Sequence, residues 1–134
     1  MISSACCPIQ SLAEYEDPNV VKVVRNQRQL AAYFSRAPIP WIRDGESTDH
    51  ADMHWSEARR HLGIYAYSVG YLIRFCELTP APTELTEKLE QLRALWHGDA
   101  IVVCDASEIP GPGVDSTQDL RRVAEYFESL PATR

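Results

Sequence analysis

The apolar residues of the first 34 positions fall into short runs separated by polar segments. Ile2 to Ile9 is one such run, and the polar, helix-prone stretch Ser11 to Glu16 follows it. Val20 to Val24 and Leu30 to Phe34 are rich in β-branched or aromatic residues and have polar residues between them. The pattern predicts a strand, a helical turn and then two strands paired as a hairpin with a longer loop.

The later part of the chain mixes strand and helix patterns. His61 to Tyr67 alternates apolar and aromatic residues as a buried strand does, and Val69 to Leu78 continues at helical spacing. From Thr83 one longer helix is predicted, ending near Gly98, because the apolar residues recur at helical period: Leu85, Leu89, Leu92 and Leu95 or Trp96.

The last residues complete the predicted architecture. Ile101 to Cys104 is a short strand, and Ser116 is predicted to cap a last helix whose inner face is formed by Leu120, Val123 and Phe127. Strands and helices intermix along residues 1–134, and no internal repeat is visible. The prediction is one α/β domain with about five strands and about three to four helices.

Composition and charge narrow the classes of partner. The chain has 134 residues, of which 45% are hydrophobic and 24% charged, as expected for one globular domain. Its formal net charge of -6 argues against attraction to nucleic acid or an anionic membrane, so small molecules are the expected partners. Eleven of the thirteen basic residues are arginines, which bind carboxylates and phosphates. A local anion site and ordinary surface charge both stay open.

The cysteines and the hydropathy indicate the compartment. Cys6, Cys7, Cys76 and Cys104 show no C-x-x-C spacing and follow no secretory signal, so buried, unreactive thiols are expected. No apolar run approaches the roughly 18 residues that cross a bilayer. We therefore expect a soluble, cytoplasmic protein.

Several polar residues have more than one explanation at this level. The segment between Pro38 and Arg60 holds nine ionisable side chains, which is typical of either a functional loop or a disordered segment. Within it, His50 and His54 have the spacing of metal ligands but lack a defined third ligand. Asp115 precedes the last helix, where a carboxylate acts either as a cap or as a ligand of a hard cation such as Mg²⁺.

Three further residues look structural when judged by pattern alone. Glu90 and Gln91 lie among charged residues of the helix predicted after Thr83 and are expected on its solvent-facing side. His61 begins an apolar strand, where a hydrogen-bonded structural histidine is commoner than a ligand. The stretch Gly111 to Ser116 imitates a dinucleotide-binding fingerprint but lacks its third glycine.

Five segments of the chain carry a resemblance when they are taken together. They are Asp17 to Val24 (DPNVVKVV), Tyr33 to Trp41 (YFSRAPIPW), His61 to Tyr67 (HLGIYAY), Leu89 to Trp96 (LEQLRALW) and Gly113 to Leu120 (GVDSTQDL). In this order and at these spacings, they resemble the 3-deoxy-manno-octulosonate cytidylyltransferase family, also called CMP-Kdo synthetase. The resemblance covers almost the whole chain.

The resemblance implies Mg²⁺-dependent transfer of CMP from CTP to 3-deoxy-manno-octulosonate (Kdo), with release of pyrophosphate, for lipopolysaccharide biosynthesis. It implies that six residues bind Kdo: Arg36, Arg43, His61, Tyr65, Glu90 and Gln91. Asp115 is implied to be catalytic, as one of two aspartates that bind Mg²⁺. The implied fold is the C-terminal part of a Rossmann-like nucleotidyltransferase with a mixed sheet, and the implied assembly is a homodimer.

The chain also departs from the family's pattern. Ser68 stands where a basic residue is common, His97 stands where an aromatic residue is usual, and Asp44 to Ser56 matches poorly. No segment matches the family's CTP-binding half, which carries a basic, glycine-containing loop and the second metal-binding aspartate. We therefore expect an inactive chain with exposed strand edges that pairs with a copy of itself or with a separate N-terminal half. The alternative is a non-catalytic sugar-binding or assembly module.

Overall fold

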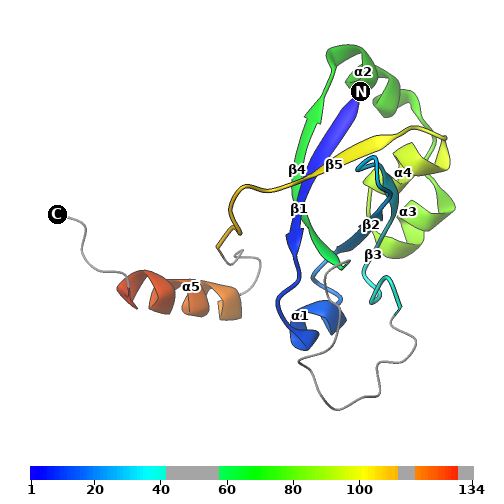
Figure 1. Cartoon of the computed structure of the whole chain (residues 1–134). Helices are drawn as coiled ribbons and strands as arrows, with labels where there is room; N and C mark the ends of the chain where they lie inside the picture. Colours follow the sequence, from blue (N-terminus) through cyan, green and yellow to red (C-terminus); the bar gives the residue numbers. More distant parts are fainter. Residues whose placement is uncertain (42–57, 112–116, 130–134) are drawn as a thin grey trace.

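The computed structural model describes residues 1–41, 58–111 and 117–129 of the chain (Figure 1). The elements in chain order are β1 (Ile2–Pro8), α1 (Leu12–Glu16), β2 (Lys22–Arg25), β3 (Ala31–Ser35), β4 (Arg59–Tyr67), α2 (Val69–Glu77), α3 (Pro82–Glu87), α4 (Gln91–Trp96), β5 (Ile101–Asp105) and α5 (Thr117–Ser129). All five predicted strands are present, with bounds that differ from the predicted ones by at most two residues.

The strands form one mixed sheet in the order β3-β2-β4-β1-β5. β1 is parallel to β5 and antiparallel to β4, while β2 is antiparallel to both β3 and β4. The predicted hairpin is confirmed as β2 and β3, in which Val23 lies opposite Phe34. The α/β class and the mixed sheet are confirmed as well.

The sheet curls until its two edge strands meet. Leu30, just before β3, forms an isolated bridge with Val102 of β5, and the Val103 amide donates to the Gln29 carbonyl at 2.8 Å. The Arg25 guanidinium donates to the Val103 carbonyl at 2.7 Å. The expectation of exposed strand edges is wrong at this point, because the edges satisfy each other's backbone groups.

One face of the sheet packs against α3 and α4 and carries the main core. Its buried members among the described residues are Ile2, Cys6, Val23, Phe34, Leu89, Leu92, Ala94, Ile101 and Val103. Aromatic side chains of β4 and α2 pack at the border of this core: Tyr65, Tyr67, Tyr71 and Phe75. Burial of these apolar surfaces is the main force that holds the two helices on the sheet.

The single long helix predicted after Thr83 is wrong, because the segment forms the two short helices α3 and α4. Pro82 lies in the first turn of α3, where a proline is tolerated, and α3 ends at Lys88, whose φ of 56° is left-handed. The break leaves Leu85 55% exposed, whereas Leu89 and Leu92 are buried. The described residues thus contain five helices instead of the predicted three to four.

Two helices leave apolar side chains in solvent. On α2, Val69, Leu72 and Ile73 are exposed. α5 lies apart from the sheet (Figure 1), and its Leu120 and Phe127 are 57% and 66% exposed, so the predicted inner face is not packed against the described residues. The predicted cap Ser116 lies outside the described residues. Among the helices of the described ranges, none is long and apolar enough to cross a membrane.

Candidate functional site

The predicted site residues fall into two groups. Asp115 and Arg43, like His50 and His54, lie outside the described residues. The structure places the other five, which are Arg36, His61, Tyr65, Glu90 and Gln91. These five come from β4, from the residue that follows β3 and from the junction between α3 and α4.

His61 lies on β4 within a group of aromatic rings. Its ring centroid is 4.9 Å from that of Phe34, in an edge-on arrangement, and 5.4 Å from that of Tyr65. The ring of Tyr67 follows at 5.8 Å from Tyr65. The three β4 side chains share one face of the sheet because successive side chains of a strand alternate. The structure thus brings His61 and Tyr65 together.

Ser4 of β1 connects the His61 ring to the backbone of β4. Its hydroxyl oxygen lies 2.8 Å from Nε2 of His61 and donates to the Ile64 carbonyl, also at 2.8 Å. The pairing of β1 with β4 is irregular here, since Ser4 lies opposite Tyr65 whereas Cys6 lies opposite His61. The hydroxyl therefore bridges the imidazole and the irregular stretch of β4.

Burial keeps His61 neutral. It lowers the pKa of His61 from 6.5 to about 4, because the imidazolium form loses its hydration among apolar side chains. At pH 7 the ring therefore has one N–H donor and one acceptor nitrogen. A neutral ring suits hydrogen bonds to hydroxyl groups better than binding of an anion.

The Tyr65 hydroxyl is buried and has no hydrogen-bond partner among the described residues. Burial raises the pKa of Tyr65, and the charges of Tyr67 and Glu90 raise it further, so the phenol keeps its proton at pH 7. A buried polar group without a partner costs about 1–3 kcal/mol. Such a group calls for a partner that the described side chains do not supply, such as a water molecule or a polar atom of a ligand.

Glu90 and Gln91 stand at the start of α4. Glu90 is the exposed residue before the helix, and Gln91 is its first residue. Gln91 is only 5% exposed, so the prediction of a solvent-facing side chain is wrong for it. After the larger effect of burial, the Glu90 charge raises the pKa of both Tyr65 and Tyr67. The start of α4 therefore lies beside the aromatic residues of β4.

Hydrogen bonds to Glu87, the last residue of α3, and to Pro18 hold Arg36 in place. Its amide donates to the Glu87 carboxylate at 2.8 Å, its Nε donates to the Glu87 carbonyl at 2.8 Å, and its Nη1 donates to the Pro18 carbonyl at 3.0 Å. The Ser35 hydroxyl donates to the other carboxylate oxygen of Glu87 at 2.7 Å. Two guanidinium nitrogens of Arg36 thus serve the fold, and Nη2 bonds to none of the described residues.

Lys22 supports the same region from within the sheet. Its side chain is fully buried, and its ammonium group donates to the carbonyls of Asp17, Val20 and Arg36 at 2.8, 2.6 and 2.7 Å. Burial lowers the pKa of Lys22, and the charges of Asp17 and Glu87 oppose that shift. Three carbonyl acceptors match the three donors of an ammonium group, so the backbone of Arg36 is fixed.

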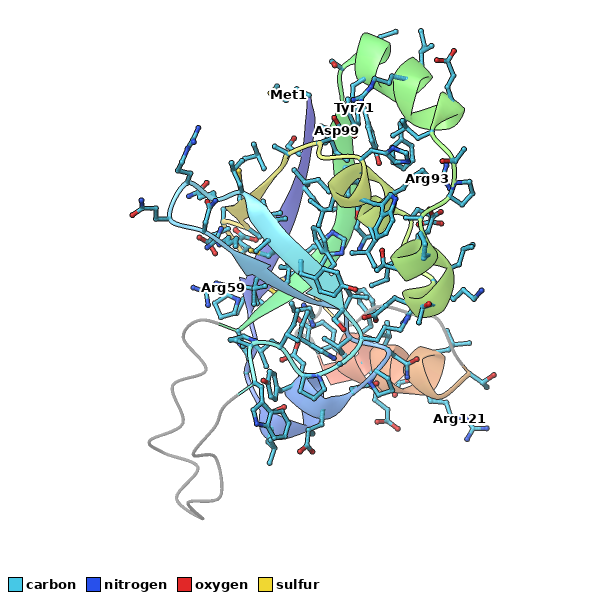
Figure 2. All side chains as sticks on the ribbon, turned by 90° about the vertical axis from the view of Figure 1, so that its right-hand side faces the viewer. Met1, Arg59, Tyr71, Arg93, Asp99 and Arg121 are labelled. Atoms are coloured by element: carbon cyan, nitrogen blue, oxygen red, sulfur yellow. The ribbon has the colours of Figure 1, made fainter. Side chains whose placement is uncertain are left out.

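A partly buried ion pair stabilises the junction between α3 and α4. The Glu84 carboxylate accepts hydrogen bonds from Arg93 at 2.5 and 2.9 Å and from the Ala81 amide at 3.0 Å. The bond from Arg93 lowers the pKa of Glu84. The Arg93 guanidinium also lies 5.1 Å from the centroid of the Phe75 ring. Figure 2 shows Arg93 on this side of the molecule, where it connects α3, α4 and α2.

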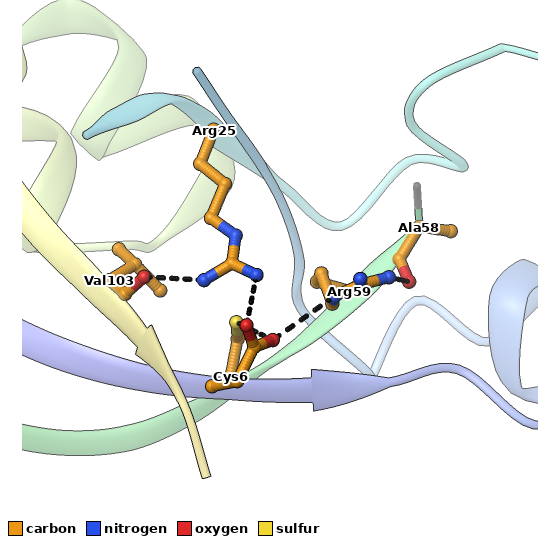
Figure 3. Close-up of polar contacts among 6 residues, drawn as sticks. Cys6, Arg25, Ala58, Arg59 and Val103 are labelled. Atoms are coloured by element: carbon orange, nitrogen blue, oxygen red, sulfur yellow. Dashed lines mark hydrogen bonds and ion pairs between the residues drawn. The ribbon is translucent and has the colours of Figure 1, made fainter. Parts of the chain in front are cut away.

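A second polar cluster lies near the end of β5 (Figure 3). The Asp105 carboxylate pairs with Arg25 at 2.5 Å and with Arg59 at 3.3 Å, and it accepts the Cys6 thiol at 3.8 Å. The bond from Arg25 is the main cause that lowers the pKa of Asp105. A hollow of about 390 Å³ is lined by Arg25, Asn26, Gln27, Gln29 and Arg59, and none of the predicted site residues lines it. We assign this cluster to the joining of the sheet edges.

The cysteines agree only in part with the prediction. Cys6 and Cys7 are buried, and burial raises the pKa of Cys6 to about 11, so this thiol stays protonated. Cys76 and Cys104 are exposed, so the expectation of burial is wrong for these two.

The described residues do not form a complete Mg²⁺ site by themselves. No group of three or more His, Cys, Asp or Glu side chains among the described residues is arranged to hold a metal ion. The Asp115 carboxylate is a suitable donor for Mg²⁺, but it lies outside the described residues. The described residues alone therefore do not supply a complete set of ligands.

Pattern reasoning missed the residues that support the site. Ser4, Lys22 and Glu87 each fix a predicted site residue through hydrogen bonds. A lysine within the apolar run Val20 to Val24 is a signal of a paired, buried charge. Ser4 and Glu87 give no comparable signal, because their partners are distant in the sequence.

Known proteins resemble the chain in both sequence and structure. A family model described as cytidylyltransferase matches residues 2–101. Proteins named 3-deoxy-manno-octulosonate cytidylyltransferase are similar to the chain. That of Alkalilimnicola ehrlichii is 55% identical over 114 residues (84% of this chain, 44% of the relative), and that of Halorhodospira halophila is 49% identical over 129 residues (96% and 50%).

The fold has a solved counterpart. The structure of CMP:2-keto-3-deoxy-manno-octonic acid synthetase complexed with CTP matches with a TM-score of 0.79 and 38% identity, over 96% of this chain and 50% of that chain. The chain thus spans about half the length of the proteins it matches.

Proposed function

The chain belongs to the cytidylyltransferase family, and on that premise we propose that it supplies the Kdo-binding part of a CMP-Kdo synthetase. The reaction transfers CMP from CTP to Kdo and releases pyrophosphate. Relatives of that name and the synthetase structure with CTP support the proposal. Lipopolysaccharide synthesis in the cytoplasm and a homodimeric assembly belong to the same proposal.

One observation carries the sugar-binding assignment, namely the buried Tyr65 hydroxyl without a partner among the described residues. It lies beside the neutral His61 ring and near the Glu90 carboxylate. A ligand with several hydroxyl groups suits this set, because each hydroxyl both donates and accepts a hydrogen bond. Kdo has such hydroxyls and also a carboxylate.

The arginines are proposed to bind the carboxylate of Kdo. Arg36 is held by Glu87, Pro18 and Lys22, so its guanidinium needs little reordering when an anion binds. Its Nη2 group remains for the ligand, and Arg43 would add a second fork. Gln91 would contribute amide hydrogen bonds at the start of α4. These residues position the sugar so that its hydroxyl faces the nucleotide.

Asp115 stays the predicted Mg²⁺ ligand and catalytic residue. When bound, the ion would polarise phosphate oxygens of the nucleotide. Isothermal titration of Mg²⁺ into the wild-type chain and into Asp115→Asn tests this role. We expect a weak binding signal that the substitution removes, and equal signals from both proteins would contradict it.

The alternative is a non-catalytic sugar-binding or assembly module, which fits a chain that spans about half of its relatives. Incubation of the chain with CTP, Kdo and Mg²⁺ tests this alternative. Formation of CMP-Kdo by the chain alone would reject it, together with the expectation of an inactive chain. Kdo binding without product agrees with both possibilities.

Calorimetric titration of Kdo into the chain and into Tyr65→Phe tests the sugar-binding assignment. We expect saturable binding by the wild type and binding weakened about threefold to tenfold by the loss of one hydrogen bond. The same substitution removes a buried unpaired hydroxyl, so the free protein is expected to become about 1 kcal/mol more stable. Weaker binding together with higher stability is the signature of a group kept for a ligand.

A control variant and a second site variant complete the test. Tyr126→Phe changes a tyrosine on α5, away from the sheet, and is expected to leave Kdo binding unchanged. Arg36→Lys keeps the charge but removes the planar fork, and is expected to weaken binding more than Tyr65→Phe does. Absence of any Kdo signal from a folded wild-type chain would refute the assignment.

A further inference from the structure

The contacts of Ser4 determine which nitrogen of His61 carries the proton. The Ser4 hydroxyl has one hydrogen, and two groups lie at 2.8 Å from its oxygen: the Ile64 carbonyl and Nε2 of His61. A carbonyl can only accept, so the hydrogen of Ser4 is given to Ile64. The Ser4 oxygen then accepts from His61, which requires a proton on Nε2.

The opposite arrangement does not satisfy both contacts. If Ser4 donated to an unprotonated Nε2, the Ser4 oxygen and the Ile64 carbonyl oxygen would face each other at 2.8 Å without a hydrogen between them. Two oxygen atoms that face each other at this distance without a hydrogen repel each other, so such a contact is costly. The irregular pairing between β1 and β4 brings the Ile64 carbonyl to this position.

We propose that Ser4 is a positioning residue that holds His61 in the Nε2-protonated tautomer and thereby leaves Nδ1 as a hydrogen-bond acceptor for a hydroxyl of the bound sugar. The role of the ligand in this statement rests on the proposed function; the tautomer does not. Nδ1 has no hydrogen-bond partner among the described residues. The low pKa of His61 keeps the ring neutral, so Nδ1 retains its lone pair at pH 7.

The tautomer assigns different tasks to the parts of the site. An unprotonated Nδ1 accepts from a hydroxyl and repels a carboxylate oxygen, which has no hydrogen to give. Among the described residues, the carboxylate of the ligand is therefore directed to Arg36. Discrimination of this kind is strong, because an analogue without the hydroxyl leaves a polar group of the site unpaired.

Nitrogen-15 NMR of the histidine rings tests the tautomer in the free chain. The resonances of His61 are identified as those that are absent from the spectrum of His61→Gln. We expect the Nδ1 resonance of the wild type in the range of an unprotonated nitrogen, and a mixture of tautomers in Ser4→Ala. Ser4→Thr keeps the hydroxyl and is expected to restore the wild-type spectrum. Ser3→Ala, at the neighbouring position on β1, is the matched control and should change nothing.

Titration of Kdo completes the test. Ser4→Ala is expected to weaken Kdo binding about threefold to tenfold. Ser4→Thr and Ser3→Ala are expected to bind Kdo as the wild type does. A proton on Nδ1 in the wild type, or an unchanged tautomer in Ser4→Ala, would overturn the proposal. If Ser4→Ala does not fold, the protonated nitrogen of His61 in the wild type and in Ser4→Thr decides whether the proposal holds. Lack of Kdo binding by all variants would refute the proposed function and leave the tautomer result intact.

Discussion

Apolar side chains are buried in one part of the molecule and exposed in another. The first part lies between the sheet and the helices α3 and α4, and the second is formed by the outer sides of α2 and α5. In the first region Leu89 and Leu92 are buried, whereas Ile73 of α2 and Phe127 of α5 are exposed. Apolar residues recur at helical spacing in each of these parts of the sequence, counting α3 and α4 together. Apolar spacing alone therefore does not determine which surface is buried.

Polar anchors lie at the border of the buried region. Lys22 binds three carbonyls at one side, and the Glu84–Arg93 pair joins α3 to α4 at the other. Such groups are satisfied only in one arrangement of the elements, so they fix how the apolar faces meet. If these anchors define the buried region, stability is concentrated there and is small on the outer sides of α2 and α5.

The largest expected effect comes from a pair of leucines. Leu92→Ala removes a fully buried side chain and is expected to lower the free energy of unfolding by about 2–5 kcal/mol. Leu85→Ala, on α3 but 55% exposed, is expected to stay within about 0.5 kcal/mol of the wild type. Urea unfolding monitored by circular dichroism measures both. Equal losses would break the comparison, because Leu85 would then be buried in solution.

Stability should also fall in mild acid because of His61. Its pKa is lowered in the folded state from 6.5 to about 4, so the unfolded chain takes up a proton that the folded chain excludes. The loss begins as the pH falls below 6.5 and is complete below pH 4, with a size on the order of 3 kcal/mol. His61→Gln should remove this part of the pH dependence and His97→Gln should keep it, as measured by urea unfolding between pH 4 and 7. The same slope in both variants would contradict it.

The Glu84–Arg93 pair should have a smaller effect. Glu84→Gln keeps the shape but removes the charge beside Arg93, and is expected to cost about 1–3 kcal/mol. Glu77→Gln, an exposed site at the end of α2, is the matched control and should be nearly neutral. Thermal unfolding of the two variants measures the difference. A neutral result for Glu84→Gln would show that the pair does not define the border of the buried region.

The smallest effect is expected on the outer side of α2. Ile73→Ser is predicted to change the free energy of unfolding by no more than about 0.5 kcal/mol, because the side chain is already exposed. It should also reduce aggregation at high concentration, measured by light scattering, since it removes exposed apolar surface. A loss comparable to that of Leu92→Ala would show that this side of α2 is covered in solution.

The strands could be predicted because each has a local signature. The alternation from His61 to Tyr67 and the two apolar runs around the hairpin loop gave β4, β2 and β3. The division of α3 from α4 could not be predicted, because it depends on a left-handed Lys88, a conformation usually taken by glycine. The exposure of α5 also escaped the pattern, since spacing does not say what a helix packs against.

The candidate site residues could be predicted from the family resemblance but not from the spacing of apolar and polar residues. Glu90 and Gln91 look like part of a charged helix side, and His61 looks like a structural histidine. Only the fold shows that Ser4 meets His61 across 57 residues of sequence, or that Glu87 holds Arg36 across 51. The roles of Arg43 and Asp115 stay predictions.

The central place of β1 in the sheet has a consequence for folding kinetics. Ile2 lies opposite Tyr67 on one side and opposite Ile101 on the other. Contacts between such distant residues require large loops to close first, which slows folding. During translation at about 5–20 residues per second, β1 would wait roughly 5 to 20 seconds for β5 to be synthesised. The complete sheet therefore forms late, and a nascent chain that lacks β5 exposes β1 to chaperones or to aggregation.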